Sequence, residues 1–205
     1  DAFERAADLD ELWAQLTTPW KKLEILPAPR GWHAPPEIWG RTPAVLTSAR
    51  RVYDMVVADL PADALPTHRE VIAQAEEVLL VCTPEPLSLH LARRKLEELR
   101  DYDATVRLVV NRIGSRYSWS QQETEELVGR RVDHVLCNDY AATRQACMDG
   151  AMVDEKKELG RQLQSLASAV MKVREPEEAP ASPKAVRWLQ GGKFSWLEQQ
   201  VAVGS

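Results

Sequence analysis

The chain has 205 residues, of which 44% are hydrophobic and 28% are charged, and its formal net charge is −5. This hydrophobic fraction is too high for a disordered chain, and no apolar run reaches the roughly 18 residues that a membrane span needs. The mildly acidic balance argues against a domain built mainly to bind nucleic acid. The three cysteines (Cys82, Cys137 and Cys147) form no CxxC pair and lack the spacing of a zinc site, so we expect reduced thiols in or near the core.

The middle of the chain alternates short apolar runs with amphipathic stretches. Most of the runs are continuous rather than alternating, which is typical of strands that are buried on both faces of a parallel sheet. The runs are Leu23–Leu26, Met55–Ala58, Val78–Cys82, Val106–Val110 and Val132–Leu136.

Helical patterns separate these runs. An apolar stripe over residues 89–99 predicts a helix with Ser88 as its N-cap, and Ser120 and Glu123 form the capping-box pattern at the start of another. Residues 159–170 carry the stripe of the last helix. This order predicts an α/β fold, a mostly parallel and doubly wound sheet that is flanked by helices and has right-handed crossovers.

Three regions fall outside the alternation. Residues 27–43 contain five prolines and predict an irregular connection, whereas residues 173–185 have the Pro- and Glu-rich composition of a linker. Residues 186–205 form an apolar, aromatic tail that could fold back on its own domain, bind a partner or lie on a membrane surface. We therefore expect one folded domain over residues 1–172, followed by the linker and the tail.

Two further features have both a structural and a functional interpretation. Trp13, Trp20, Trp32 and Trp39 crowd the first forty positions, where they predict either a local core or a docking surface for a partner. The basic run Arg93–Lys95 is most simply the solvated face of a helix, although such faces can also contact DNA or partners.

Polar residues follow four of the apolar runs, at the points where the predicted strands end. Asp59 follows the second run, and the next three runs lead to Pro84, to Asn111 and to the pair Asn138–Asp139. Ligands of open α/β sheets bind at this edge, where a carboxylate can hold Mg²⁺ and amide groups can read a purine ring. A simpler alternative for Asp59 is that it only caps the following turn.

Five motifs follow one another along the chain. They are Tyr53–Pro61 (Tyr-Asp-x-Val-Val-x-Asp-x-Pro), Glu76–Glu85 (Glu-x-Val-Leu-Leu-Val-x-Thr-Pro-Glu), Ser88–Arg94 (Ser-Leu-x-x-Ala-Arg-Arg), Val109–Arg112 (Val-Val-Asn-Arg) and Asn138–Tyr140 (Asn-Asp-Tyr). In this order they resemble the MinD/ParA group of P-loop ATPases, over about residues 23–171. Ser88–Arg94 and Asn138–Tyr140 are most similar to the CpaE/TadZ branch, which positions the machinery of Flp (Tad) pili.

The resemblance implies a role for each of the polar residues. Asp59 would be the Walker B aspartate, and is therefore the expected catalytic and metal-binding residue, near Mg²⁺ and the attacking water. Asn111, Pro84, Asn138 and Asp139 fall where the family holds adenine. The implied cofactors are ATP and Mg²⁺.

The resemblance also implies partners and a location. We expect a homodimer that works with other pilus or secretion assembly proteins and contacts a membrane surface, but not a nucleic acid. The expected location is the cytoplasm, at the inner membrane or a cell pole. The alternatives are a non-catalytic pseudo-ATPase scaffold that binds partners, and a partitioning or cell-division ATPase of the same group.

One element of the family pattern does not occur in these 205 residues. The family binds phosphates with a Gly-rich loop that carries Lys and Ser or Thr. The segment Gly191–Lys193 is no substitute, because Phe194 replaces the hydroxyl residue and the segment lies in the tail. We expect the loop and its strand upstream of Asp1, which would make the fold incomplete at the N-terminus; otherwise the chain is a degenerate homologue.

Overall fold

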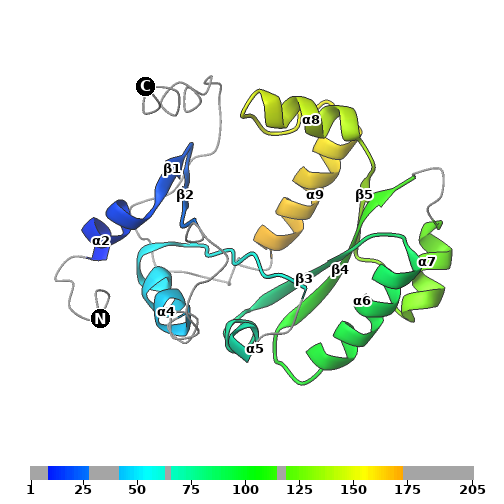
Figure 1. The fold of residues 1–205 in the computed structure, drawn as a ribbon, viewed down its shortest axis with the longest axis horizontal. Helices are drawn as coiled ribbons and strands as arrows, with labels where there is room; N and C mark the ends of the chain where they lie inside the picture. Colours follow the sequence, from blue (N-terminus) through cyan, green and yellow to red (C-terminus); the bar gives the residue numbers. More distant parts are fainter. Residues whose placement is uncertain (1–8, 28–41, 63–65, 115–118, 173–205) are drawn as a thin grey trace, which may run out of the picture. The chain divides into compact units, whose positions relative to one another are not determined.

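The computed structural model describes residues 9–27, 42–62, 66–114 and 119–172 (Figure 1). The linker and tail predicted over residues 173–205 lie outside the described residues, as does most of the proline-rich connection. The chain divides into two compact units. The first comprises residues up to Glu76 together with Tyr102–Ala104, and the second comprises Glu77–Asp101 and the residues from Thr105 onward.

The second unit contains the parallel sheet that the apolar runs predict. Its strands are β3 (Glu77–Cys82), β4 (Thr105–Ile113) and β5 (His134–Cys137), and they lie side by side in the order β3-β4-β5. Its helices are α6 (Pro86–Leu99), α7 (Gln121–Val128), α8 (Tyr140–Met148) and α9 (Glu158–Lys172). The prediction of an α/β fold with a parallel sheet flanked by helices is therefore confirmed.

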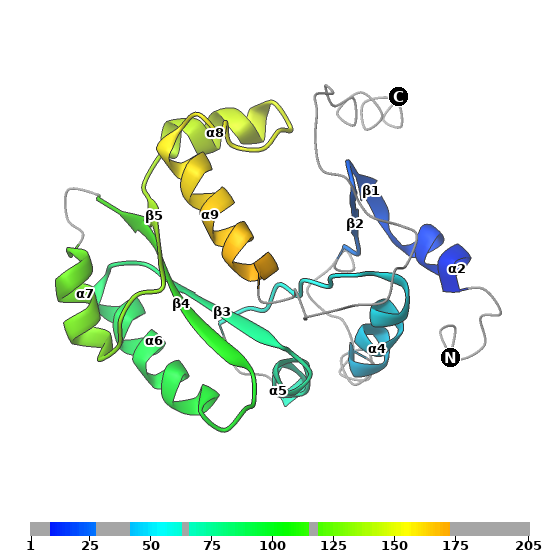
Figure 2. The same cartoon turned by 180° about the vertical axis from the view of Figure 1, so that it is seen from behind.

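The helices cover both faces of this sheet. Helices α6 and α7 lie on one face and α9 lies on the other, with α8 next to the start of α9 (Figures 1 and 2). None of the described helices is long and apolar enough to cross a membrane.

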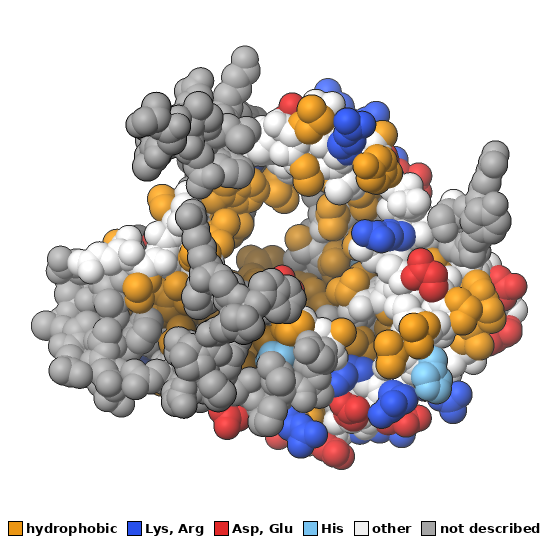
Figure 3. Space-filling model, viewed as in Figure 1, with side chains coloured by type: hydrophobic (Ala, Val, Ile, Leu, Met, Phe, Trp, Pro, Cys, Tyr) orange, Lys and Arg blue, Asp and Glu red, His pale blue; other side chains and the backbone are white. Residues whose placement is uncertain are grey.

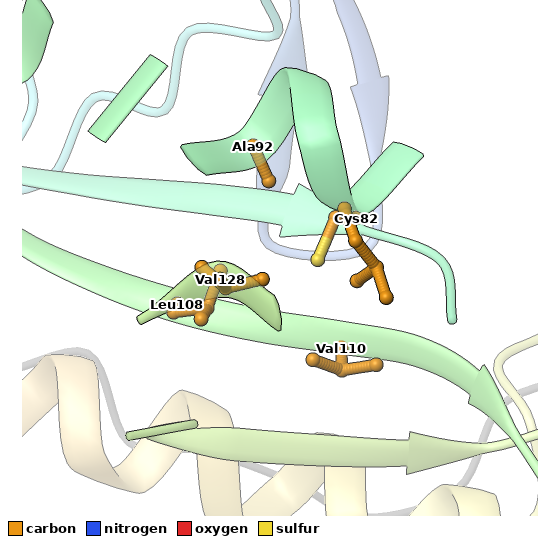
Figure 4. Close-up of a cluster of buried hydrophobic side chains, with 6 residues drawn as sticks. Cys82, Ala92, Leu108, Val110 and Val128 are labelled. Carbon is orange, nitrogen blue, oxygen red and sulfur yellow. The ribbon is translucent and has the colours of Figure 1, made fainter. Parts of the chain in front are cut away.

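Strand β4 connects the two apolar cores of the unit. On the side of α6 and α7, Leu108 and Val110 pack with Cys82 of β3 and with three helix residues, namely Leu89, Ala92 and Val128 (Figure 4). On the other side, Val109 packs with Leu136 of β5 and Leu159 of α9. Leu108, Val109 and Val110 are each 0% exposed, which explains why this strand reads as a continuous apolar run.

The local sequence correctly predicted the N-cap of α7 but not that of α6. Ser120 and Glu123 form the predicted capping box of α7, because the Glu123 amide donates to Ser120 Oγ (3.3 Å) and the Ser120 amide donates to Glu123 Oε2 (2.8 Å). The sequence predicted Ser88 as the N-cap of α6, but Glu85 occupies that position and Pro86 begins the helix. A proline suits the first helical turn, since it lacks the amide hydrogen that would be unsatisfied there.

The first unit is built around Trp13. Its helices are α2 (Leu9–Leu16), α4 (Thr42–Val52) and α5 (Pro66–Ala73), and β1 (Thr18–Trp20) pairs antiparallel with β2 (Leu23–Ile25). Trp13 is 3% exposed, donates through Nε1 to Ser48 Oγ (3.3 Å) and meets the Tyr53 ring edge-on at 5.5 Å. For this tryptophan the local-core interpretation is confirmed, whereas Trp32 and Trp39 lie outside the described residues.

Two predicted strands differ from the structure. Residues 23–26 were expected in a buried parallel sheet, but β2 belongs to an antiparallel hairpin and all three of its residues are exposed. Residues 55–58 form no strand, and Val57 is 84% exposed. A strand requires a neighbour for its backbone amides and carbonyls, and the described part of the chain provides none for residues 55–58.

Thr124 provides a test of the packing between α7 and the sheet. Its side chain is 0% exposed and its hydroxyl has no hydrogen-bond partner among the described residues. We predict that Thr124→Val raises the free energy of unfolding of the full-length protein by about 1 kcal/mol, because it removes an unsatisfied buried hydroxyl at nearly constant volume. Urea unfolding measures this change. Thr124→Ser, which keeps the hydroxyl, should lower stability, and a loss for both variants would show that the hydroxyl is bonded.

Gly160 tests how tightly α9 approaches the preceding loop. A Cβ at this position would lie 2.1 Å from the backbone oxygen of Asp154, which itself accepts a hydrogen bond from the Lys157 amide. We predict that Gly160→Ala lowers the free energy of unfolding by about 2–3 kcal/mol, because backbone must move to make room. Gly129→Ala is the matched control, since φ is +74° there but a Cβ meets open space. The control should cost about 1 kcal/mol, and an equal cost for both would contradict the tight contact.

Candidate functional site

The candidate site lies at the carboxyl edge of the parallel sheet. Cys82 at the end of β3 is level with Val110 of β4, and Ile113 at the end of β4 is level with Cys137 at the end of β5. The residues that follow these ends therefore emerge at one edge of the second unit. Four of the five predicted site residues lie at this edge: Pro84 follows β3, Asn111 lies near the end of β4, and Asn138 and Asp139 follow β5.

Pro84 belongs to the turn between β3 and α6, and its side chain is fully buried. The same turn is closed by Ser88, whose Oγ accepts a hydrogen bond from the Thr83 amide at 3.0 Å. Pro84 therefore shapes this turn from the inside, and its ring presents little surface to a ligand.

Asn111 lies in an irregular part of β4. Val110 pairs with Val135, but Ile113 pairs with Cys137, so three steps along β4 correspond to two along β5. This pattern is a β-bulge, which contains one extra residue and changes the direction of side chains at the end of a strand. Asn111 is half-buried, and the next residue, Arg112, is exposed and has a positive φ of 63°.

Asn138 and Asp139 connect β5 to α8. The Asn138 amide donates to the carbonyl of Ile113 at 3.0 Å, which fixes this turn to the end of β4, while the Asn138 side chain is exposed. Asp139 is the N-cap of α8, because its Oδ1 accepts a hydrogen bond from the Ala142 amide at 2.9 Å. One carboxylate oxygen of Asp139 is thus engaged in the fold.

Asp59 belongs to the first unit and follows the irregular segment over residues 55–58. Its side chain is exposed and makes no hydrogen bond or ion pair with another described residue. Within the described ranges no group of three His, Cys, Asp or Glu side chains could hold a metal ion. A single free carboxylate nevertheless fits Mg²⁺, which proteins often bind through one or two carboxylates while phosphates and water supply the other ligands.

Burial disfavours the thiolate form of the two cysteines near the site, Cys82 and Cys137. Burial raises the pKa of the Cys82 thiol to about 11, and burial, followed by the charges of Glu158 and Asp139, raises the pKa of Cys137. Both thiols are therefore protonated at neutral pH, whereas the reactive form of cysteine is the thiolate. Cys147 is exposed on α8, which corrects the expectation that all three thiols lie in or near the core.

A cavity that no sequence pattern predicted opens beside the bulge. It has a volume of about 400 Å³. Ser120 and Glu123 contribute to its wall but satisfy each other in the capping box, and Gln121 adds a further polar group to an otherwise mainly apolar wall. The lining residues are Ile113, Gly114, Trp119, Ser120, Gln121, Glu123 and Val135.

Comparison with known proteins identifies the fold. No protein-family model matches the chain, and no curated protein sequence does. Among solved structures, it is similar to a ParA family ATPase from Chlorobium tepidum, with a TM-score of 0.70 and 20% identity over 82% of this chain and 71% of that one. It is also similar to the cell division ATPase MinD of Pyrococcus furiosus (TM-score 0.65, 20% identity, 80% of this chain and 75% of that one).

A third similar structure was solved with a nucleotide. This is the septum site-determining protein MinD of Pyrococcus horikoshii, which is complexed with Mg-ADP; the TM-score is 0.65 and the identity is 19%, over 84% of this chain and 77% of that one. At these identities the similarity establishes architecture rather than activity. The chain has the fold of the ParA and MinD ATPases.

Proposed function

We propose that the protein is an ATPase of the MinD/ParA type that acts as a CpaE/TadZ-like localisation or assembly factor for Flp (Tad) pili. The observation that carries this proposal is the carboxyl edge of the sheet, where Asn111 lies near the end of β4 and Asn138 and Asp139 directly follow β5. The likeness to a MinD that was solved with Mg-ADP supports the same proposal.

In this proposal the edge binds adenine. The carboxamide of Asn111 offers one donor group and one acceptor, which matches the paired acceptor and donor atoms on the edge of adenine. Asn138 supplies a second exposed carboxamide, and the free carboxylate oxygen of Asp139 can accept a hydrogen bond. Pro84 then contributes through the shape of its turn rather than by direct contact.

Asp59 would bind Mg²⁺, and a Gly-rich loop from outside these residues would bind the phosphates. The ion, when bound, neutralises charge that develops on the phosphates during transfer to water. Asp59 fits this task because its carboxylate is exposed and not engaged by other described residues.

The partners would be a second copy of the chain and other pilus or secretion assembly proteins, in the cytoplasm at the inner membrane or a cell pole. One similar solved structure is a MinC:MinD complex from Aquifex aeolicus. Nucleic acid is a poor fit, since Arg93 pairs with Glu97 (3.8 Å) and Lys95 with Glu98 (2.6 Å) on α6. Figure 3 likewise shows basic side chains interspersed with acidic ones over the face in view.

A second candidate function is a non-catalytic scaffold that binds partners. It is favoured by the irregular backbone of residues 55–58, because a Walker B aspartate is normally held at the end of a strand. A partitioning or cell-division ATPase of the same group is a third candidate. Nucleotide binding separates the scaffold from the two ATPases.

Asn111 tests the adenine site. We predict that Asn111→Ala weakens ATP binding by the full-length protein about tenfold or more, since two hydrogen bonds of about 0.5–1.5 kcal/mol each are lost. Isothermal titration calorimetry measures the affinity. Gln164→Ala, at an exposed position on α9, is the control and should bind ATP like the wild type. Equal affinities for all three proteins would remove Asn111 from the site.

Asp59 tests the catalytic assignment. We predict that Asp59→Ala abolishes ATP hydrolysis while the melting temperature stays unchanged, because the exposed side chain has no partner among the described residues to lose. Phosphate release measures turnover, and Asp54→Ala, in the same exposed stretch, is the matched control. Unchanged turnover in Asp59→Ala would contradict the Walker B role. A wild-type protein whose melting temperature does not respond to ATP would support the scaffold instead.

A further inference from the structure

The last residue of β5 is held by a side chain from α9. The Cys137 amide donates a hydrogen bond to Gln162 Oε1 at 2.7 Å, across 25 residues of sequence, and this bond is partly shielded from solvent. The amide of the next residue, Asn138, donates in the other direction, to the carbonyl of Ile113 on β4. The Cys137 amide therefore faces away from the sheet.

Gln162 takes the place of a neighbouring strand. In the described part of the chain β5 is the last strand of its sheet. The outward amides of an edge strand have no strand to bond to, and a buried or half-buried amide without a partner is unfavourable. Gln162 supplies the missing acceptor. Its Nε2 donates to Glu158 Oε1 at 3.4 Å, one turn earlier on α9, which leaves Oε1 directed at β5.

Helix α9 is a firm support for this bond. Leu159 and Leu163, which lie on either side of Gln162 along the helix, pack in the core around Val109. Gly160 lies so close to the preceding loop that no Cβ fits between them. Gln162 is therefore carried by a helix that is fixed both to the sheet and to the loop before it.

The turn after β5 depends on such a support. It leads into α8, and none of the residues of α8 is buried, so the packing of this helix does not hold the turn. The bond from the Ala142 amide to Asp139 ties the turn only to α8 itself. The bonds to Ile113 and Gln162 tie the turn to the sheet and to α9.

We propose that Gln162 is a positioning residue for the nucleotide edge: by accepting the Cys137 amide, it holds the turn in which Asn138 and Asp139 face the base. This inference rests on the proposed function, because it requires that a base binds at this edge. It assigns to α9 a part in nucleotide binding, although Gln162 acts through the backbone of β5 and does not contact the nucleotide.

The test removes the acceptor but keeps the size of the side chain. In Gln162→Met the side chain has nearly the same length but leaves the Cys137 amide without its acceptor. We expect the affinities of the full-length protein for ATP and ADP to fall together by about tenfold, because the turn would be in its binding position only about a tenth of the time. The melting temperature should fall by about 2–4 °C. Isothermal titration calorimetry measures the affinities, at a temperature where each variant is folded.

Two further variants separate positioning from a general effect on α9. Gln162→Glu is the rescue variant, since its carboxylate oxygen can accept the Cys137 amide in the same place, and it should bind both nucleotides like the wild type. Gln164→Met makes the matched substitution at an exposed position of the same helix and should change neither affinity. If Gln162→Met does not fold, Gln162→Asn replaces it, because its shorter side chain withdraws the oxygen from β5.

A lower melting temperature in Gln162→Met with unchanged affinities would overturn the proposal, because Gln162 would then serve only the fold. A loss of affinity that Gln162→Glu does not restore, or that Gln164→Met shares, would overturn it as well. If Asn111→Ala weakens ATP binding but Gln162→Met does not, only this inference fails. If the wild type binds neither nucleotide, the proposed function fails with it.

Discussion

The burial of β4 on both faces is the constraint on which the second unit depends. Leu108, Val109 and Val110 are completely buried, and they alternate between a core under α6 and α7 and a core under α9. A strand in this position has no room for a polar side chain until it leaves the cores. Polar side chains are therefore restricted to the carboxyl end of the strand, where Asn111 and Arg112 are the first residues after the buried segment.

The sequence predicted the part of the fold that depends on burial along a single segment. Continuous apolar runs located β3, β4 and β5, and capping and periodicity located α7 and α9, because these signals are local. Residues 23–26 and 55–58 carry the same kind of run, but the first forms an exposed hairpin and the second forms no strand. An apolar run indicates that a segment can form a strand. Whether it does so depends on a neighbouring strand to pair with, which the segment itself does not encode.

The candidate site was predictable to a similar degree. That Asn111 and Asn138 emerge at one edge follows from parallel order, since the carboxyl ends of such strands meet there. The bulge, the conformation of Arg112 and the cavity beside Trp119 depend on the register between β4 and β5 and on where Ile113 packs, which no local pattern reports. The cap that Asp139 forms was visible in principle, because Asp is a favoured N-cap residue and α8 begins directly after it.

The residues that the proposed function uses in the two units differ in how each unit supports them. At the carboxyl edge of the sheet, hydrogen bonds fix the frame: the Ile113 carbonyl holds the Asn138 amide, and the Asp139 carboxylate holds the start of α8. The side chains of Asn138 and Arg112 make no hydrogen bond or ion pair with other described residues. A rigid frame with free side chains lowers the entropic cost of binding. Asp59 lacks such a frame, since its preceding segment has no strand pairing. In the proposed function, recognition of the base would thus rest on the packed sheet, whereas the geometry for hydrolysis would depend on what orders residues 55–59.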